Sequence, residues 1–183
     1  MPPPRVEQKK RMAIIGIVAV DRSGAIGKGG GLPWHYPADK RFFKEQTKGN
    51  ACLMGYKTWL SMKRPLPDRL NIVLTRRADT EPRESVLWVR DAQSVLSLYE
   101  YLDCDLYVLG GAQIFKLFRA QIDRWLVTRI PLTTEDADTF LPPDILEGFS
   151  PQDTRDLGDD LKVTFYERAR YSDLHLNEHG SLK

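Results

Sequence analysis

One carboxylate, Asp39, stands where a side chain could do acid–base chemistry, in the stretch GGGLPWHYPADKRFFK at residues 29–44. Pro37 suits the first position of a helix, so Asp39 falls in the first turn, where the helix dipole favours a carboxylate even on an exposed surface. Trp34 and Phe43 add apolar walls, and a carboxylate is costly there unless it meets a fixed partner with paired donors. The amidine-like edge of a heterocycle would be such a partner.

Three predicted strand ends carry groups that suit phosphate. They are Gly110 and Gly111 in VLGGAQIF, Lys57 and Thr58 in MGYKTWLSM, and Thr75, Arg76 and Arg77 in NIVLTRR. Glycines before a helix expose backbone N–H groups, and arginine binds phosphate through two parallel donors. Each feature alone could be a packing turn or a solvated charge. Together they predict a long ligand with several phosphates, such as a dinucleotide.

The glycine-rich run GAIGKGGGLPW, residues 24–34, could move as an active-site lid or be a plain surface loop. Other chemistries lack their residues. His35 is isolated, and His175 and His179 fall in the predicted tail, so no zinc set, HExxH motif or Ser-His-Asp arrangement can be assembled. The chain also lacks a GxxxxGK[ST] phosphate loop. We therefore predict no metal, and neither hydrolysis nor phosphoryl transfer.

Composition limits the partners. The chain has 27 Lys plus Arg against 25 Asp plus Glu, a formal charge of +2, which is too balanced to predict nucleic-acid binding. Its longest apolar run, residues 13–20, is too short to span a membrane. Cys52 and Cys104 lack CxxC spacing and are expected to be reduced. We expect a cytoplasmic protein.

The predicted elements alternate between strand and helix, which indicates an α/β domain. Apolar, β-branched runs predict strands at residues 13–21, 51–55, 70–75, 86–89, 106–111, 125–130 and 162–168. Helices are predicted at 37–48, 56–61, 92–102 and 112–119. We expect one domain at 12–170, a flexible arm at 1–11 and a polar tail at 171–183. Ligands should bind at the carboxyl ends of the strands.

These motifs, in this order, resemble those of dihydrofolate reductase of the chromosomal, monomeric type. The resemblance covers about residues 12–170 and rests on AIIGIVAVDRSGAIGKGGGLPWHYPADKRFFK, MGYKTWLSM, RPLPDRLNIVLT, YVLGGAQIF and DADTFLP. It implies a mostly parallel, mixed eight-stranded sheet flanked by helices. It also implies that 7,8-dihydrofolate is reduced with NADPH to tetrahydrofolate for one-carbon metabolism, by a monomer that binds antifolate-like molecules.

The resemblance implies substrate roles by matching position. Asp39 would bind the pterin N3 and 2-amino group and favour protonation at N5 while nicotinamide delivers hydride to C6, with Thr128 supporting it through a hydroxyl and a water. Trp34 would hold a bridging water, and Leu32 would close over the site. Arg69 would pair with the substrate's glutamate α-carboxylate. The other implied substrate contacts are Ile15, Ile17, Lys40, Phe43, Met62, Leu66, Leu109 and Phe115.

The resemblance also implies cofactor roles. Gly110, Gly111, Ala112 and Gln113 would cradle the pyrophosphate, with a cis peptide between the first two. Lys57 and Thr58 would bind phosphate oxygens, and Thr75 and Arg76 would engage the 2′-phosphate, which favours NADPH over NADH. The other implied cofactor contacts are Ile17, Ile26, Gly27, Leu32, Tyr56, Leu74, Leu109, Ile114 and Phe115.

Three residues depart from the family pattern. Lys40 stands where the family often has an apolar residue, Tyr56 where some members have an arginine for the 2′-phosphate, and Ala137 where some have a glycine. Two alternatives stay open. A pyrimidine reductase of riboflavin synthesis would share fold and cofactor but is not expected to combine LPW, the helix aspartate and RPLPxR. A nucleotide-binding module without catalysis would be supported if Asp39 faced solvent.

Overall fold

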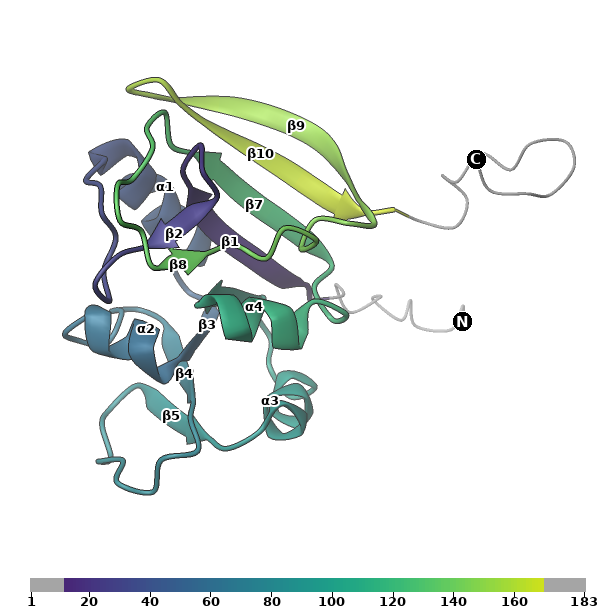
Figure 1. Ribbon diagram of the computed structural model, residues 1–183. Coiled ribbons are helices and arrows are strands. Elements are labelled where there is room, and N and C mark those ends of the chain that lie inside the picture. Colours follow the sequence, from purple (N-terminus) through teal and green to yellow (C-terminus); the bar gives the residue numbers. More distant parts are fainter. Residues whose placement is uncertain (1–11, 170–183) are drawn as a thin grey trace, which may run out of the picture.

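The structure is a computed structural model that describes residues 12–169. Its main sheet has eight strands in the order β5-β4-β3-β6-β1-β7-β10-β9, and a separate two-stranded sheet pairs β2 with β8. Every pairing from β5 to β7 is parallel, and β10 runs antiparallel to both β7 and β9. The predicted mostly parallel, mixed eight-stranded sheet is therefore confirmed. Figure 1 shows the β9–β10 hairpin at one edge of this sheet and β5 at the other.

The strands and helices have the following bounds. The strands are β1 Ile14–Val20, β2 Ala25–Gly27, β3 Ala51–Gly55, β4 Leu70–Leu74, β5 Val86–Val89, β6 Leu106–Gly110, β7 Arg124–Arg129, β8 Thr139–Phe140, β9 Phe149–Gly158 and β10 Leu161–Arg168. The helices are α1 Pro37–Thr47, α2 Tyr56–Ser61, α3 Ala92–Tyr99 and α4 Ala112–Phe118.

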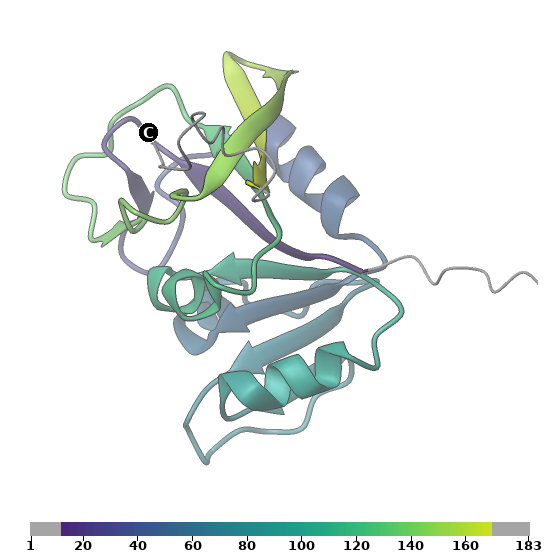
Figure 2. The ribbon, with the colours of Figure 1, turned by 90° about the vertical axis from the view of Figure 1, so that its right-hand side faces the viewer.

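Two apolar layers sandwich the sheet. Phe42 of α1 and Trp59 of α2 belong to one buried cluster, and Val95 of α3 and Phe118 of α4 belong to the other. Alternate residues of β1 enter the two clusters because successive side chains of a strand point to opposite faces. Figures 1 and 2 show α1 and α4 on opposite sides of the sheet. The buried layers hold the strand ends rigidly, which is what a site at those ends requires.

A glycine in β1 makes room for the largest side chain of the α3–α4 layer. Trp125 of β7 is fully buried, and a Cβ added at Gly16 would lie 2.3 Å from its ring. No real Cβ tolerates that approach, so any larger residue would displace the indole. Gly16 therefore lets β1 and β7 pair closely at the centre of the sheet.

Sequence reasoning misplaced a helix end and missed three strands. The helix predicted over 92–102 ends at Tyr99, because the chain closes it with a tighter turn in which Tyr101 N–H donates to Leu98 and Leu102 N–H to Tyr99. The edge strand β9 is exposed along most of its length, so it shows no apolar alternation to predict it. The strands β2 and β8 are too short to show a period.

The predicted arm at 1–11 and tail at 171–183 lie outside the described residues, so the domain boundaries stay predictions. Within residues 12–169 no helix has the length and apolar character needed to cross a membrane. Cys52 is fully buried and Cys104 partly so, and both thiols are free.

Candidate functional site

Asp39 faces the sheet. The helix α1 starts at Pro37, as predicted, and buries Ala38 and Phe42 on either side of Asp39 along the same face. Asp39 is half-buried, and this burial raises the pKa of its carboxyl, while the nearby Thr128 hydroxyl lowers that pKa in part. Thr128 lies on β7 and is itself buried. The two side chains that the resemblance pairs therefore lie near each other, and Asp39 does not face open solvent.

Trp34 offers an unused donor near the start of α1. Its side chain is 8% exposed and packs with Ala38, Ile130 and Leu161. Its indole Nε1 has no hydrogen-bond partner within residues 12–169. A buried N–H group without a partner costs free energy, so this position is suited to a ligand or an ordered water. The predicted role of Trp34 in holding a water fits this geometry.

Most of the apolar residues predicted to contact substrate lie in one cluster on the α1–α2 face of the sheet. These are Ile15, Ile17, Phe43, Met62, Leu66 and Leu109. They come from β1, α1, the loop after α2 and β6, so they spread across this face of the sheet. Phe115 lies instead in the other cluster, 1% exposed and packed against Trp125 with a centroid distance of 5.1 Å. Its ring packs directly against Gly110, because a Cβ added at Gly110 would lie 2.8 Å from that ring. Phe115 therefore adjoins the site through Gly110 and does not belong to the substrate cluster.

Arg69 is a buried cation that no anion pairs with among residues 12–169. Its side chain is 8% exposed, and its Nε has no partner within residues 12–169. Its Nη2 donates a long hydrogen bond of 3.4 Å to the Lys44 carbonyl, and no ion pair to it forms in the same range. A buried guanidinium is stabilised by a carboxylate that accepts two parallel hydrogen bonds. This arrangement fits the glutamate end of a folate.

The predicted pyrophosphate cradle brings two helix starts together. Gly110 and Gly111 are joined by a cis peptide, as the resemblance implied, and α4 begins immediately after them. A Cβ added at Gly111 would lie 3.7 Å from Oγ1 of Thr58, in the first turn of α2. Lys57 beside it is exposed. Backbone N–H groups and a hydroxyl thus meet at the carboxyl ends of β3 and β6, with the exposed Lys57 next to them in sequence, which suits a diphosphate.

Two arginines follow β4 in different states. Arg77 lies over the Tyr56 ring, with its Cζ 5.0 Å from the centroid, and its Nε donates to Asp79 at 3.0 Å. Arg76 is exposed and forms no ion pair within the described part of the chain. Thr75, 8% exposed, accepts a hydrogen bond of 3.2 Å from the Arg77 backbone N–H. Arg76 is therefore the available cation, which agrees with its predicted role.

The remaining predicted cofactor residues line the same end of the sheet. Leu74 ends β4, Ile26 and Gly27 lie in β2, and Ala112, Gln113 and Ile114 open α4. Leu32, predicted to close over the site, is 57% exposed. Lys40 is exposed, and its Nζ lies 3.0 Å from Nδ1 of His35.

The glycine-rich loop is braced by the segment between β7 and β8. Gly29 N–H donates to Asp138 at 2.7 Å, and Lys28 Nζ donates to the Glu135 carbonyl at 2.8 Å. The strand pairing of β2 with β8 continues this contact (Figure 1). These bonds hold the loop beside the carboxyl end of the sheet, where a lid has to lie.

Sequence reasoning missed Asp21, which fixes the turn below this loop. Asp21 is 3% exposed, and its carboxylate accepts from Ser23 N–H, Ser23 hydroxyl and Ala25 N–H on one oxygen and from Thr134 N–H on the other. Burial alone would raise the pKa of Asp21, but these hydrogen bonds hold it well below its ordinary value. The available signal was local: an aspartate two residues before a serine is typical of a hydrogen-bonded turn.

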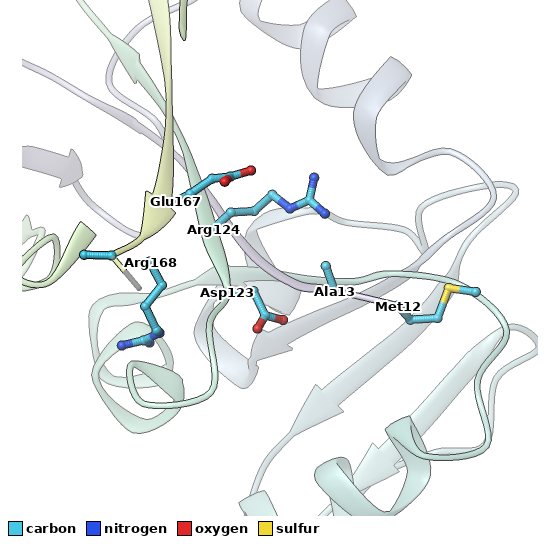
Figure 3. Close-up of a pocket in the computed structure, with 7 residues that line it drawn as sticks. Met12, Ala13, Asp123, Arg124, Glu167 and Arg168 are labelled. Carbon is cyan, nitrogen blue, oxygen red and sulfur yellow. The ribbon is translucent and has the colours of Figure 1, made fainter. Parts of the chain in front are cut away.

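A cavity of about 400 Å³ lies away from this site. Figure 3 shows its lining, which includes Met12, Asp123, Arg124, Glu167 and Arg168. These residues stand at the amino ends of β1 and β7 and at the end of antiparallel β10. The cavity therefore lies at the opposite end of the strands from the predicted cofactor site. None of the predicted site residues lines it.

Comparisons with known proteins agree with this geometry. The family model for dihydrofolate reductase matches residues 13–170. The chain belongs to the dihydrofolate reductase family. It is 38% identical over 126 residues to the dihydrofolate reductase of Haemophilus influenzae, covering 69% of this chain and 76% of that protein. It is 35% identical over 172 residues to that of Saccharomyces cerevisiae, covering 80% and 81%.

A solved structure supports the same assignment. Dihydrofolate reductase from Enterococcus faecalis, complexed with NADP(H) and RAB-propyl, superposes with a TM-score of 0.80 at 33% identity, covering 86% of this chain and 97% of that one. As a dihydrofolate reductase, the protein is an oxidoreductase that reduces 7,8-dihydrofolate to tetrahydrofolate with NADPH as its cofactor. The pyrimidine reductase and the non-catalytic module are therefore not supported.

Proposed function

We propose that Asp39 is the group that binds the pterin and favours its protonation at N5. The observation that carries this proposal is a half-buried carboxylate on the sheet-facing side of α1, near Thr128 of β7. Its two oxygens can accept from the ring N3–H and the 2-amino group, the paired donors that such a carboxylate needs. A fixed anion at that edge stabilises the cation formed when N5 takes a proton, because the surrounding dielectric is low.

The cofactor site fits NADPH by its own residues. Bound NADPH supplies the hydride that reaches C6. Gly110, Gly111 and Thr58 hold the diphosphate through backbone N–H groups and a hydroxyl. Thr75 and Arg76 take the 2′-phosphate, since Arg77 is occupied by Tyr56 and Asp79. The braced loop with Leu32 excludes water from the reacting edge of the sheet.

The substrate tail lies along the cluster that holds Phe43, Met62 and Leu66 and ends at Arg69, whose guanidinium binds the α-carboxylate. Antifolate-like molecules with a similar flat ring would use the same surface. Lys40 covers part of it with its alkyl stem, while its ammonium stays near His35.

We also propose a cytoplasmic monomer without nucleic-acid or membrane partners. The balanced charge of +2 supports this, and the family resemblance supports the monomer. Light scattering after size exclusion should give about the mass of one 21.0 kDa chain. A stable mass of twice that value would contradict the monomer.

The experiment that tests the proposal compares wild type with Asp39→Asn. The assay follows the loss of NADPH absorbance in the presence of dihydrofolate. It is then repeated with NADH in place of NADPH. The variant should lose about 10²- to 10⁴-fold in kcat at neutral pH, because the amide cannot stabilise the N5 cation. Its rate should recover as pH falls, since the substrate is then protonated in solution.

Glu45→Gln is the matched control, because Glu45 is an exposed carboxylate on the same helix. It should leave kcat unchanged. An Asp39→Asn variant that keeps full activity, or whose loss is the same at every pH, would contradict the proposed role of Asp39.

A further inference from the structure

The loop between α2 and β4, residues 62–69, carries the side chains assigned above to the benzoyl-glutamate half of the substrate, namely Met62, Leu66 and Arg69. It has no regular secondary structure to hold it. Its sequence MKRPLPDR contains prolines, which donate no backbone hydrogen bond, and Lys63 and Asp68 each have a φ of 59°. Something other than a backbone ladder must fix its shape.

One buried side chain makes three bonds to this loop, and Gly49 N–H makes another by donating to the Asp68 carbonyl at 2.9 Å. Leu66 N–H donates to Oδ1 of Asn71 at 2.9 Å, and Nδ2 of Asn71 donates to the Leu66 carbonyl at 3.0 Å and the Arg69 carbonyl at 3.2 Å. The same Nδ2 also donates to the Ser85 carbonyl at 3.2 Å. Asn71 is 0% exposed. Both polar groups of the Leu66 backbone are therefore bound to one amide, as a strand partner would bind them.

The sheet fixes Asn71 independently of the loop. Asn71 is the second residue of β4 and pairs with Cys52 on β3 and Val86 on β5. Its backbone N–H donates to Ser85 at 3.0 Å. The sheet therefore fixes the side-chain amide of Asn71, and this amide holds the loop in a defined position relative to β4.

The position of Arg69 depends on the Asn71 side chain. Its guanidinium is buried, its Nε is unpartnered within residues 12–169, and its Nη2 makes only the long bond to Lys44. Side-chain contacts therefore restrain the guanidinium weakly, and its place follows from the backbone at Arg69, whose carbonyl Asn71 holds. A bidentate carboxylate site is sensitive to displacements of about 1 Å.

We propose that Asn71 is a positioning residue that sets the affinity for the benzoyl-glutamate part of the substrate by holding Leu66 and Arg69 in place. The proposal rests on the proposed role of Arg69. Asn71 does not act on the pterin ring, because none of its hydrogen bonds reaches α1 or β7. It should therefore affect KM for dihydrofolate and leave the hydride-transfer step unchanged.

The test compares dihydrofolate with 6-methyl-7,8-dihydropterin, which has the same ring without the benzoyl-glutamate tail. In Asn71→Ala we expect KM for dihydrofolate to rise about 10- to 100-fold with little change in kcat. We expect kcat/KM for the methyl dihydropterin to stay within about twofold, because that molecule does not reach Arg69. Asn71→Asp, which keeps the acceptor for Leu66 N–H and removes the donors, should show the same selective loss.

Asn50→Ala is the matched control. Asn50 also holds backbone through its side chain, accepting from Asp105 N–H and donating to the carbonyls of Gln46 and Lys48, but that side chain makes no hydrogen bond to residues 62–69. Its backbone carbonyl, which accepts from Leu70 N–H, is kept in the alanine variant. Its KM for dihydrofolate should not change. Arg69→Leu provides the coupling test, since Asn71→Ala should add little to KM in that background.

An equal loss on both substrates in the Asn71 variants would overturn the proposal, because it would show general damage to the fold. So would additive effects of Asn71→Ala and Arg69→Leu. If Arg69→Leu alone leaves KM for dihydrofolate unchanged, the role of Arg69 is wrong and the inference falls with it. Wild type that reduces neither substrate would refute the assigned reaction itself.

Discussion

Replacing Asp21 with asparagine tests whether a buried carboxylate holds the active-site loops through its hydrogen bonds to their backbone. Its Oδ1 accepts from Ser23 N–H, Ser23 hydroxyl and Ala25 N–H at 2.7–2.9 Å, and its Oδ2 accepts from Thr134 N–H at 2.7 Å. An asparagine has one carbonyl oxygen. If that oxygen keeps the bonds to Ser23 and Ala25, the amide NH₂ group faces the Thr134 N–H.

This geometry sets the expected loss. The least damaging orientation of the introduced amide removes one charge-assisted bond and leaves the partly buried Thr134 N–H without an acceptor, which costs about 2–3 kcal/mol. The opposite orientation gives up the bonds to Ser23 and Ala25 and costs more. For a chain of this length, about 2–3 kcal/mol corresponds to a fall in Tm of about 4–12 °C.

The dependence on pH of the stability that Asp21 contributes provides a second check. The pKa of Asp21 in the folded protein is held below the ordinary value of 3.8. A lowered folded-state pKa contributes stability that is fully present above the unfolded pKa and is lost as pH falls toward the folded pKa. The difference in Tm between wild type and Asp21→Asn should therefore be constant at pH 5–8 and narrow below about pH 4.

Thermal unfolding followed by circular dichroism measures both effects. Ser23→Ala is the control: it removes only the hydroxyl donor at an exposed residue and should cost under about 1 kcal/mol. A fall in Tm of less than about 1 °C in Asp21→Asn, or a difference that persists unchanged at pH 3, would refute the reasoning.

Two further predictions concern the cofactor. Arg76→Gln should raise KM for NADPH about 10- to 100-fold and leave KM for NADH unchanged. Arg77→Gln should change the ratio of the two KM values little, because Arg77 is held by Tyr56 and Asp79. Steady-state assays with both cofactors measure these ratios, and a larger effect of Arg77→Gln than of Arg76→Gln would contradict the prediction. Gly110→Ala should cost about 1–3 kcal/mol of stability, because its φ is +98° and the added Cβ would lie 2.8 Å from the Phe115 ring. Thermal unfolding and NADPH titration check it, and a variant with wild-type Tm would contradict it.

Local patterns predicted the centre of the fold. Buried strands such as β3 and β6 are continuous apolar runs between breakers, and Pro37 marks the start of α1. The edge strand β9 was missed because its exposed residues carry no such pattern. Its position is set by pairing with β10, which is a tertiary contact that composition does not record.

The candidate site divides in the same way. Asp39, Gly110 and Arg69 stand in motifs whose chemistry is visible in a few neighbouring residues. The structure places Asp39 in the first turn of α1, Gly110 at the carboxyl end of β6, and Arg69 just before β4, beside Lys44 of α1. The contact of Asp39 with Thr128 was expected only through the family resemblance. The sequence shows only two adjacent arginines, and the structure distinguishes them. Arg77 contacts Tyr56 and Asp79, whereas Arg76 is exposed and available to a phosphate.

The least predictable residues are those that hold the site's loops without facing the ligand. Asp21 accepts from Thr134, 113 positions away, and Asp138 accepts from Gly29, 109 positions away. Such bonds form only after the sheet brings the loops together, so no local propensity marks them. Asn71 is close in sequence to Leu66, yet its role depends on β4 being buried. Because these side chains bond to backbone, loop sequences can change while the bonds persist, and function should be most sensitive to the side chain that supplies them.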